Sequence, residues 1–395
     1  MMNHSPLTLH HMTIHSKLPY MGKHIFSSMT ELAIKHNAIN LSQGFPDFEP
    51  SPQLQELLFE CLKDKTPPYI NQYAPAIGIP LLRQQVAKQF NDYWNISIDP
   101  ETAVTIGVGA TEMIFDIIAT FVYPGDEVII VEPCYDSYKP SINIVGGKAV
   151  AYKLPFPDFK IDWDALGKLI TNKTRLICLS SPNNPTGTVL SEDDWLQLAA
   201  LVKDTEILIM SDEVYAHMVY DGKKHVSPLS IPELRKRCLS VFSFGKTYHI
   251  TGWRIGYCVA NEVLTAELRK VHQNTVYGAP HPLQKAIALH MQQSDDYLDL
   301  AAFFQKKRDL FTRVTKDSRF KPLPCNGGYF QLFDYSAISK KNDVDFCKKL
   351  VEEYKVAAIP VSQLYSGKED NCVIRLCFAK TDNVLILAGE KLCKV

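Results

Sequence analysis

The feature that most constrains the fold is an alternation of short β-rich runs with helical stretches between residues 100 and 260. Six runs are expected to be strands: 103–107, 127–131, 175–180, 206–210, 239–243 and 255–259. Such alternation is typical of a largely parallel sheet covered by helices. The sequence therefore predicts an α/β fold.

The length of 395 residues predicts two lobes, since one domain usually holds about 100 to 200 residues. After residue 285 come a helical pattern over 282–311, a glycine break at 326–328, and strand-like runs at 329–334 and 372–378. This mixture predicts a smaller α+β domain, completed by a helix over 23–36. We therefore expect a tail and arm in 1–45 that join the small domain, a large domain in 46–285 and a small domain in 286–395.

Composition narrows the class of protein. Apolar residues make up 46% of the chain, and 42 basic residues nearly balance 43 acidic ones, for a net charge of −1. This balance supplies no broad positive field, so nucleic acid is not an expected partner. No apolar run approaches the roughly 18 residues of a membrane span, and residues 1–20 lack the apolar core of a signal peptide, so no membrane partner is expected.

The cysteines and histidines do not indicate a metal site. The ten cysteines are scattered without a Cys-x-x-Cys pair, which favours free thiols and a cytoplasmic location. The first twenty residues contain His4, His10, His11 and His15 without an accompanying cysteine or carboxylate pattern. We expect a disordered tail there and no bound metal.

Polar residues follow four of the expected strands. Thr111 follows the first, Asn184 the third, Asp212 the fourth and Lys246 the fifth. Because open α/β sheets bind ligands at the carboxyl edge of their strands, these residues are expected to form one site.

The string from Ser243 to Arg254 is the most informative one. Lys246 directly follows an apolar strand and a glycine, where a lysine that only extends its amine to solvent is the structural alternative. Arg254 lies eight residues further on, beyond a glycine turn, and supplies a permanent cation suited to a phosphate.

Two further strings carry polar groups at strand ends. Asp212 must be paired if it is buried, and a pyridinium nitrogen is a suitable partner, although an Asp-Glu pair after a strand is also commonplace. Tyr215 is placed to donate its hydroxyl to a ring oxygen. Asn184 lies between two prolines, which either form a simple turn or present its amide to a ligand.

The segment 107–112 lies between a strand and an apolar helix, where free backbone N–H groups bind phosphate. Glu112 stands where a dinucleotide-binding motif would have its third glycine, so a Rossmann dehydrogenase is disfavoured.

These four strings, in this order, resemble those of the class I/II pyridoxal-phosphate aminotransferases of fold type I. The similarity extends from about Lys17 to the end of the chain. The strings 42–48, 71–75, 243–249 and 374–380 are most similar to those of bacterial methionine aminotransferases, with kynurenine/glutamine transaminases nearby. The resemblance implies a mostly parallel seven-stranded sheet in the large domain and pyridoxal 5'-phosphate as the cofactor.

The resemblance also implies a role for each site residue. Lys246 bonds the cofactor covalently, Asp212 pairs with the pyridine nitrogen, and Tyr215 and Asn184 bind the ring hydroxyl oxygen. The implied phosphate and ring contacts are Gly109, Ala110, Thr111, Ser243, Arg254 and Tyr135. Arg375 binds the substrate carboxylate with Asn184 and Gly44, and Tyr73 reaches the phosphate of a neighbouring subunit in a homodimer with composite sites.

The same residues suit transamination. A free Lys246 in a dry pocket has a lowered pKa and becomes a useful base, and Arg375 grips a carboxylate bidentately. Dicarboxylate-specific relatives have an additional arginine that the segment 271–285 lacks. Phe26, Tyr135 and Tyr277 match positions that contact substrate side chains, although Phe26 and Tyr277 also suit an ordinary core.

We therefore expect an aminotransferase (EC 2.6.1 type) of amino-acid metabolism that takes methionine, and aromatic amino acids or kynurenine, with a 2-oxo acid as acceptor in a ping-pong mechanism. A cysteine-conjugate or cystathionine-type β-lyase on the same fold is the alternative. A transcriptional regulator on this fold would need a DNA-binding module. Only about 40 residues precede Ser42, too few for such a module and the arm, so this class is disfavoured.

Overall fold

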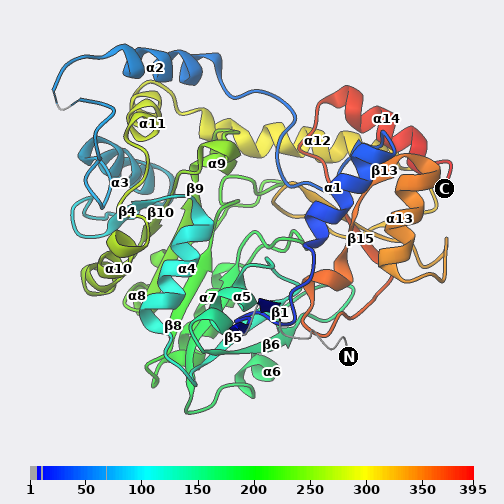
Figure 1. Ribbon diagram of the computed structural model, residues 1–395, viewed down its shortest axis with the longest axis horizontal. Helices are drawn as coiled ribbons and strands as arrows, with labels where there is room; N and C mark the ends of the chain where they lie inside the picture. The colour runs from blue at the N-terminus through cyan, green and yellow to red at the C-terminus, as the bar shows by residue number, and fades with distance from the viewer. Residues whose placement is uncertain (1–6, 10–11, 68) are drawn as a thin grey trace.

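The computed structural model describes residues 7–9, 12–67 and 69–395, and the chain forms a large lobe and a smaller one (Figure 1). The large lobe contains a seven-stranded sheet in the order β4-β10-β9-β8-β7-β5-β6. All pairs among β9, β8, β7, β5 and β6 are parallel, and β10 is antiparallel to both of its neighbours. The strands are β4 (Val104–Gly107), β5 (Glu127–Glu132), β6 (Lys148–Lys153), β7 (Thr174–Ser180), β8 (Leu208–Asp212), β9 (Cys238–Ser243) and β10 (Gly256–Val259). The predicted α/β class and mostly parallel sheet are confirmed.

Alternating side chains of the strands enter two separate cores. Ile129 and Ile177 pack with helices on one face, whereas Val128 and Leu176 pack with helices on the other. Since neighbouring residues of a strand point to opposite faces, the near-continuous apolar runs cover both sides of the sheet. The helices of the first face are α3 (Pro80–Trp94), α6 (Trp163–Gly167), α7 (Glu192–Val202), α8 (Pro232–Arg235) and α11 (His281–Gln293); those of the second are α4 (Ala110–Phe121), α5 (Tyr138–Ile144) and α10 (Glu262–Thr275).

The smaller lobe combines both ends of the chain. Its sheet has the order β11-β12-β15-β14, and β13 pairs in parallel with β3 from the N-terminal segment. The strands are β3 (Ile39–Asn40), β11 (Lys321–Pro322), β12 (Phe330–Asp334), β13 (Val356–Ala357), β14 (Ile359–Pro360) and β15 (Val373–Cys377). The helices are α1 (Ile25–Lys35), α12 (Leu300–Val314), α13 (Asp343–Tyr354) and α14 (Asp382–Leu392), and α2 (Pro52–Lys63) packs on α11 of the large lobe.

Two elements differ from the sequence-based expectation. The strand β6 was not predicted, because it is an edge strand with a lysine at each end and a mostly part-exposed surface. The helical pattern over 282–311 is divided between α11 and α12, because Ser294 adopts an extended conformation (φ −144°, ψ 137°) and ends α11.

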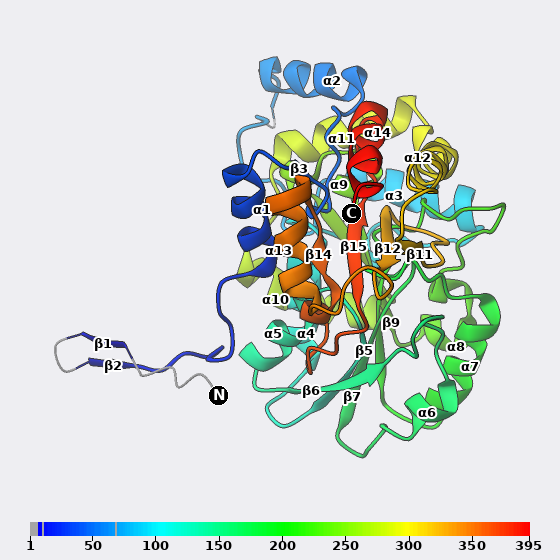
Figure 2. The ribbon, with the colours of Figure 1, turned by 90° about the vertical axis from the view of Figure 1, so that its right-hand side faces the viewer.

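The described part of the N-terminal tail contains two strands that the sequence did not predict. The strands β1 (Leu7–Leu9) and β2 (Met12–Ile14) form an antiparallel hairpin that extends from the body of the molecule (Figure 2). His15 is exposed, whereas His4, His10 and His11 lie outside the described residues. The ten cysteines are free, as predicted. None of the described helices has the length and apolarity of a membrane span.

Candidate active site

A cavity of about 480 Å³ lies at the carboxyl ends of the large sheet's parallel strands and reaches the smaller lobe. The large lobe contributes residues that follow β4, β5, β7, β8 and β9, as the strand-end argument predicts. The predicted residues that line this cavity are Phe26, Gly44, Ala110, Thr111, Tyr135, Asn184, Asp212, Tyr215, Ser243, Lys246, Arg254 and Arg375. The structure therefore gathers segments from near both ends of the sequence, from Phe26 to Arg375.

Lys246 lies on the short helix α9 (Phe244–Thr247), directly after β9. Its Nζ donates to the Tyr329 hydroxyl at 2.8 Å and to the Gly44 carbonyl oxygen at 3.0 Å. Burial, together with the charges of Arg254 and Arg375, lowers the pKa of Lys246 to about 8. A substantial fraction of this amine is therefore neutral near physiological pH, as a nucleophile or base requires.

Asp212 is the last residue of β8 and is 4% exposed. Its Oδ2 accepts a hydrogen bond from the Tyr138 hydroxyl at 2.6 Å, and its Oδ1 accepts a longer one from the Val214 N–H at 3.3 Å. Burial raises the pKa of this carboxyl, which its hydrogen bonds and Lys246 oppose. A protonated ring nitrogen beside Asp212 would supply the positive charge that a buried carboxylate requires.

The turn before α4 faces the Arg254 guanidinium. Gly109 precedes the helix with φ +81°, and a Cβ atom there would lie 2.8 Å from Arg254 Nη2. The first N–H groups of α4 have no partner within the helix, so the turn and the guanidinium together suit a phosphate. The Thr111 and Tyr135 hydroxyls are 3.1 Å apart beside this turn.

Arg375 is 1% exposed and points into the cavity from β15. Its Nη1 donates to Asn184 Oδ1 at 2.8 Å and its Nη2 to the Ser42 carbonyl oxygen at 2.9 Å. The Phe330 and Phe26 ring centroids lie 4.0 Å and 4.9 Å from its guanidinium carbon. Its Nε has no partner among the described residues, so the guanidinium keeps a donor for a carboxylate ligand.

Tyr73 and Tyr277 do not line this cavity. Their rings lie 5.0 Å apart at a different surface hollow, where Tyr73 is 86% exposed and Tyr277 is 50% exposed. Within one chain, the structure thus separates this pair from the other predicted site residues.

Several cavity contacts were not predicted from the sequence. Tyr138 holds Asp212, Tyr329 holds Lys246, and His24 lies 2.5 Å from Asp136 at the cavity wall. An aromatic residue directly after the 326–328 glycine break was a usable signal for Tyr329. The other contacts depend on tertiary packing that no local string reports.

The site fits pyridoxal phosphate on the chain's own features. Lys246, with its lowered pKa, suits the aldehyde of the cofactor. The buried Asp212, held by Tyr138, suits the ring nitrogen, and the Gly109 turn beside Arg254 suits the phosphate. The buried Arg375 is left for the substrate carboxylate.

Known proteins agree with this fit. The family described as "Aminotransferase class I and II" matches residues 36–388. The methionine aminotransferase of Escherichia coli is 42% identical over 378 residues, which cover 95% of this chain and 97% of that protein. Human kynurenine–oxoglutarate transaminase 1 is 33% identical, over 92% of this chain and 94% of its own length.

Solved structures give the same result. A structure from Escherichia coli, reported with a methionine aminotransferase function, has a TM-score of 0.94 at 42% identity and covers 97% of this chain and 100% of its own. The N-succinyldiaminopimelate aminotransferase of Mycobacterium tuberculosis has a TM-score of 0.91 at 31% identity, with the same coverage. The chain therefore belongs to the class I and II aminotransferases and uses pyridoxal phosphate as its cofactor.

Proposed function

We propose that this aminotransferase takes methionine, and aromatic amino acids or kynurenine, as amino donors and a 2-oxo acid as acceptor. The observation that carries the proposal is the distribution of charge in the cavity. Among its described lining residues, the lysine and arginine cations are Lys246, Arg254 and Arg375. We assign Lys246 and Arg254 to the cofactor and Arg375 to the substrate α-carboxylate. His24, the remaining base, lies against Asp136. Among this chain's described lining residues, no further lysine or arginine is left for a side-chain carboxylate.

Apolar groups support the same donor class. Met21, Phe26, Ile114, Val214 and Phe330 contribute to the cavity lining. An uncharged, polarizable side chain such as that of methionine or an aromatic amino acid is favoured by such a lining. Since one methylene changes binding by only about 1 to 3 kcal/mol, we expect a broad range of donors. The relatives named for methionine and kynurenine support this range.

The chain's own residues divide the catalytic work. When bound, pyridoxal phosphate supplies a conjugated ring that accepts the electron pair left when the substrate's α-carbon loses its proton. Asp212 would keep the ring nitrogen protonated, and Tyr138 holds that carboxylate in place. The Arg375 fork would orient the substrate through its carboxylate. Lys246 Nζ, neutral above its lowered pKa, would take the α-proton, with Tyr329 and Gly44 at hydrogen-bonding distance.

A panel of amino donors and 2-oxo acids tests the proposal. We expect kcat/KM for methionine and phenylalanine to exceed that for aspartate and glutamate, with the parallel double-reciprocal lines of ping-pong kinetics. A preference for the dicarboxylates would contradict the proposed donor class.

The same assay separates the β-lyase alternative. The lyase would release ammonia and pyruvate from cystathionine without amino transfer to an added oxo acid. Amino transfer to the oxo acid is the result expected here.

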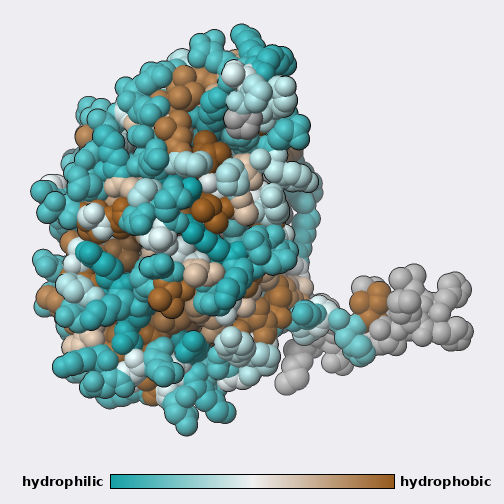
Figure 3. Space-filling model, turned by 90° about the vertical axis from the view of Figure 1, so that its left-hand side faces the viewer, coloured by the Kyte–Doolittle hydropathy of each residue, from teal (hydrophilic) through white to brown (hydrophobic). Residues whose placement is uncertain are grey.

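We further propose a homodimer in which Tyr73 reaches the partner's phosphate and Tyr277 borders the partner's substrate site. Both rings are exposed in the single chain, and exposed Phe59, Leu62 and Tyr69 belong to neighbouring parts of the sequence. Figure 3 shows apolar patches between hydrophilic side chains on the side of the molecule where α3 and α10 lie in Figure 1. Exposed apolar patches are typical of protein interfaces.

Mixing two impaired variants tests this arrangement. Lys246→Ala chains keep Tyr73, and Tyr73→Ala chains keep Lys246, so a hybrid dimer would contain one native site. We expect activity to rise above that of Tyr73→Ala alone after the two are unfolded and refolded together. Activity equal to the mean of the separate proteins would contradict the shared site.

Two organisational proposals accompany this function. The core that contains Met29 and Leu41 also contains Phe346 and Leu376, which supports a small domain made of 1–45 and 286–395 beside a large domain in 46–285. The ten free cysteines support a cytoplasmic location, where thiols stay reduced.

A further inference from the structure

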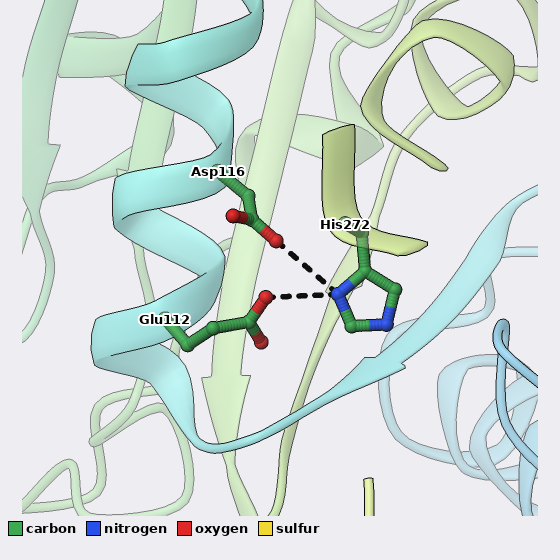
Figure 4. A group of neighbouring side chains, drawn as sticks. All are labelled: Glu112, Asp116 and His272. Atoms are coloured by element: carbon green, nitrogen blue, oxygen red, sulfur yellow. Dashed lines mark hydrogen bonds and ion pairs between the residues drawn. The ribbon is translucent and has the colours of Figure 1, made fainter. Parts of the chain in front are cut away.

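A buried group of ionisable side chains lies outside the cavity, between α4 and α10 (Figure 4). His272 of α10 has its Nδ1 2.8 Å from Glu112 Oε1 and 3.2 Å from Asp116 Oδ2. The two acidic residues are one helical turn apart on α4, so their carboxylates face α10 together. The His272 and Asp116 side chains have no exposed surface, and that of Glu112 is 11% exposed.

The hydrogen-bond partners of His272 determine its protonation. Its Nε2 lies 3.0 Å from the Ala76 carbonyl oxygen, which only accepts, so Nε2 carries a hydrogen. Its Nδ1 faces two carboxylates, which makes the imidazolium form the natural one. Burial lowers the pKa of His272, but the hydrogen bonds to Asp116 and Glu112 outweigh it and raise the pKa to about 9. Burial also raises the pKa of Glu112, to about 7, which is still below that of His272, so the proton stays on the imidazole in preference to this carboxyl.

The two residues that His272 contacts through Nδ1 and Nε2, Glu112 and Ala76, lie next to segments assigned above to the cofactor phosphate. Glu112 Oε2 accepts a hydrogen bond from the Val108 N–H at 2.8 Å, in the turn that leads to Gly109 and α4. The turn is built around this carboxylate, since a Cβ on Gly107 would lie 2.3 Å from Glu112 Oε2. The Ala76 carbonyl, which accepts from His272 Nε2, lies three residues after Tyr73.

We propose that His272 is a positioning residue: as an imidazolium, it ties the 107–111 turn, through Glu112, to the 73–76 segment, so that both keep the geometry that phosphate binding requires. The inference rests on the proposed phosphate contacts of the 109–111 turn and of Tyr73. His272 itself lines no part of the described cavity wall, so its effect on the cofactor would be indirect.

A metal ion is the competing occupant of this group, since two carboxylates and an imidazole are also metal ligands. The surroundings favour a proton. A structural zinc ion requires four ligands, and this group offers three among the described residues, in a place where His272 and Asp116 are closed to solvent.

The first test replaces His272 with glutamine and measures pyridoxal-phosphate affinity of the apo-protein by fluorescence quenching. We expect the dissociation constant to rise about tenfold or more, as for loss of a charge-assisted hydrogen bond. Leu268→Ala is the matched control, because Leu268 is buried one turn earlier on α10 and has no role in the turn. It should lower the melting temperature and leave the affinity unchanged.

A double-mutant cycle then tests the route of the effect. If His272 acts through Glu112, the His272→Gln/Glu112→Gln protein should bind the cofactor no more weakly than the weaker-binding single variant. Additive losses would overturn the proposed coupling, and so would wild-type affinity in His272→Gln. Arg254→Ala keeps the phosphate assignment separately testable: unchanged affinity there would reject that assignment rather than the role of His272.

Wild-type protein provides a test that does not depend on the folding of any variant. In ¹⁵N-histidine-labelled holoenzyme, both His272 nitrogens should carry hydrogens at pH 7.5. A neutral imidazole with a stoichiometric metal ion, measured by elemental analysis, would overturn the proposal in favour of a metal site.

Discussion

The Tyr138 hydroxyl donates a hydrogen bond to Asp212 Oδ2 at 2.6 Å, across 74 residues of sequence. Both side chains are buried, so the bond forms in surroundings where a carboxylate is poorly solvated. Tyr138 starts α5, and Asp212 ends β8. The contact therefore fixes the Asp212 carboxylate in the cavity wall from a second element, α5.

We expect Tyr138→Phe to reduce both cofactor affinity and kcat about tenfold. Removing the donor costs Asp212 a charge-assisted hydrogen bond of about 1.5 to 3 kcal/mol and raises its pKa further. Titration of apo-protein with pyridoxal phosphate and steady-state kinetics provide the measurement. Tyr135→Phe, which loses only the contact with Thr111, is the control and should have a smaller effect on kcat. An unchanged kcat in Tyr138→Phe would remove this tyrosine from the mechanism.

The pKa of Lys246 predicts how cofactor capture depends on pH. Burial and the nearby arginines lower this pKa to about 8, and only the neutral amine attacks an aldehyde. The neutral fraction rises about tenfold per pH unit below the pKa and levels off above it. Stopped-flow binding of pyridoxal phosphate to apo-protein should therefore accelerate from pH 6 to pH 8 and reach a plateau near pH 9. A midpoint near the ordinary lysine value would show that the amine is not desolvated.

Replacement of Arg375 separates substrate binding from cofactor binding. Arg375→Ala should raise KM for methionine about tenfold or more, because the α-carboxylate loses a bidentate partner, while the cofactor absorbance of the purified protein stays. Arg375→Lys should not restore KM, since an ammonium group lacks the planar fork. Equal loss of cofactor from Arg375→Ala would contradict its assignment to the substrate.

A pair of glycines separates backbone strain from loss of the phosphate site. Gly109→Ala should lower the melting temperature and also weaken cofactor binding, because its Cβ would lie 2.8 Å from Arg254 Nη2. Gly125→Ala is the matched control: Gly125 has φ +93° and an open surrounding, so only the strain of about 1 to 2 kcal/mol applies. Differential scanning fluorimetry and cofactor titration should thus separate the two variants. Equal cofactor affinity in both would contradict the role of the Gly109 turn.

Much of the cavity could be predicted from short strings. Lys246, Asp212 and Asn184 each follow an apolar strand, and parallel strands bring their carboxyl ends to one edge. The sequence therefore indicated that these residues would meet. Arg375 and Phe26 came only from the family resemblance, because their segments lie in the other lobe and no spacing rule connects them to the sheet.

Other features depended on competition between local and tertiary preferences. The helical pattern over 282–311 continues through Ser294, yet the chain turns there. The β6 strand carries lysines that weaken its apolar pattern, but its pairing with β5 satisfies its backbone at the sheet edge. Local propensity alone did not identify either outcome.

The sequence by itself determined the alternating α/β architecture and the chemical types gathered at the strand ends, because periodicity and turn residues act over a few positions. Only the tertiary structure decided which buried groups would be partners: Tyr138 with Asp212, Tyr329 with Lys246, and His272 with Glu112. Hydrogen bonds act within about 3 Å, so distant residues become partners only when packing has fixed the elements that carry them.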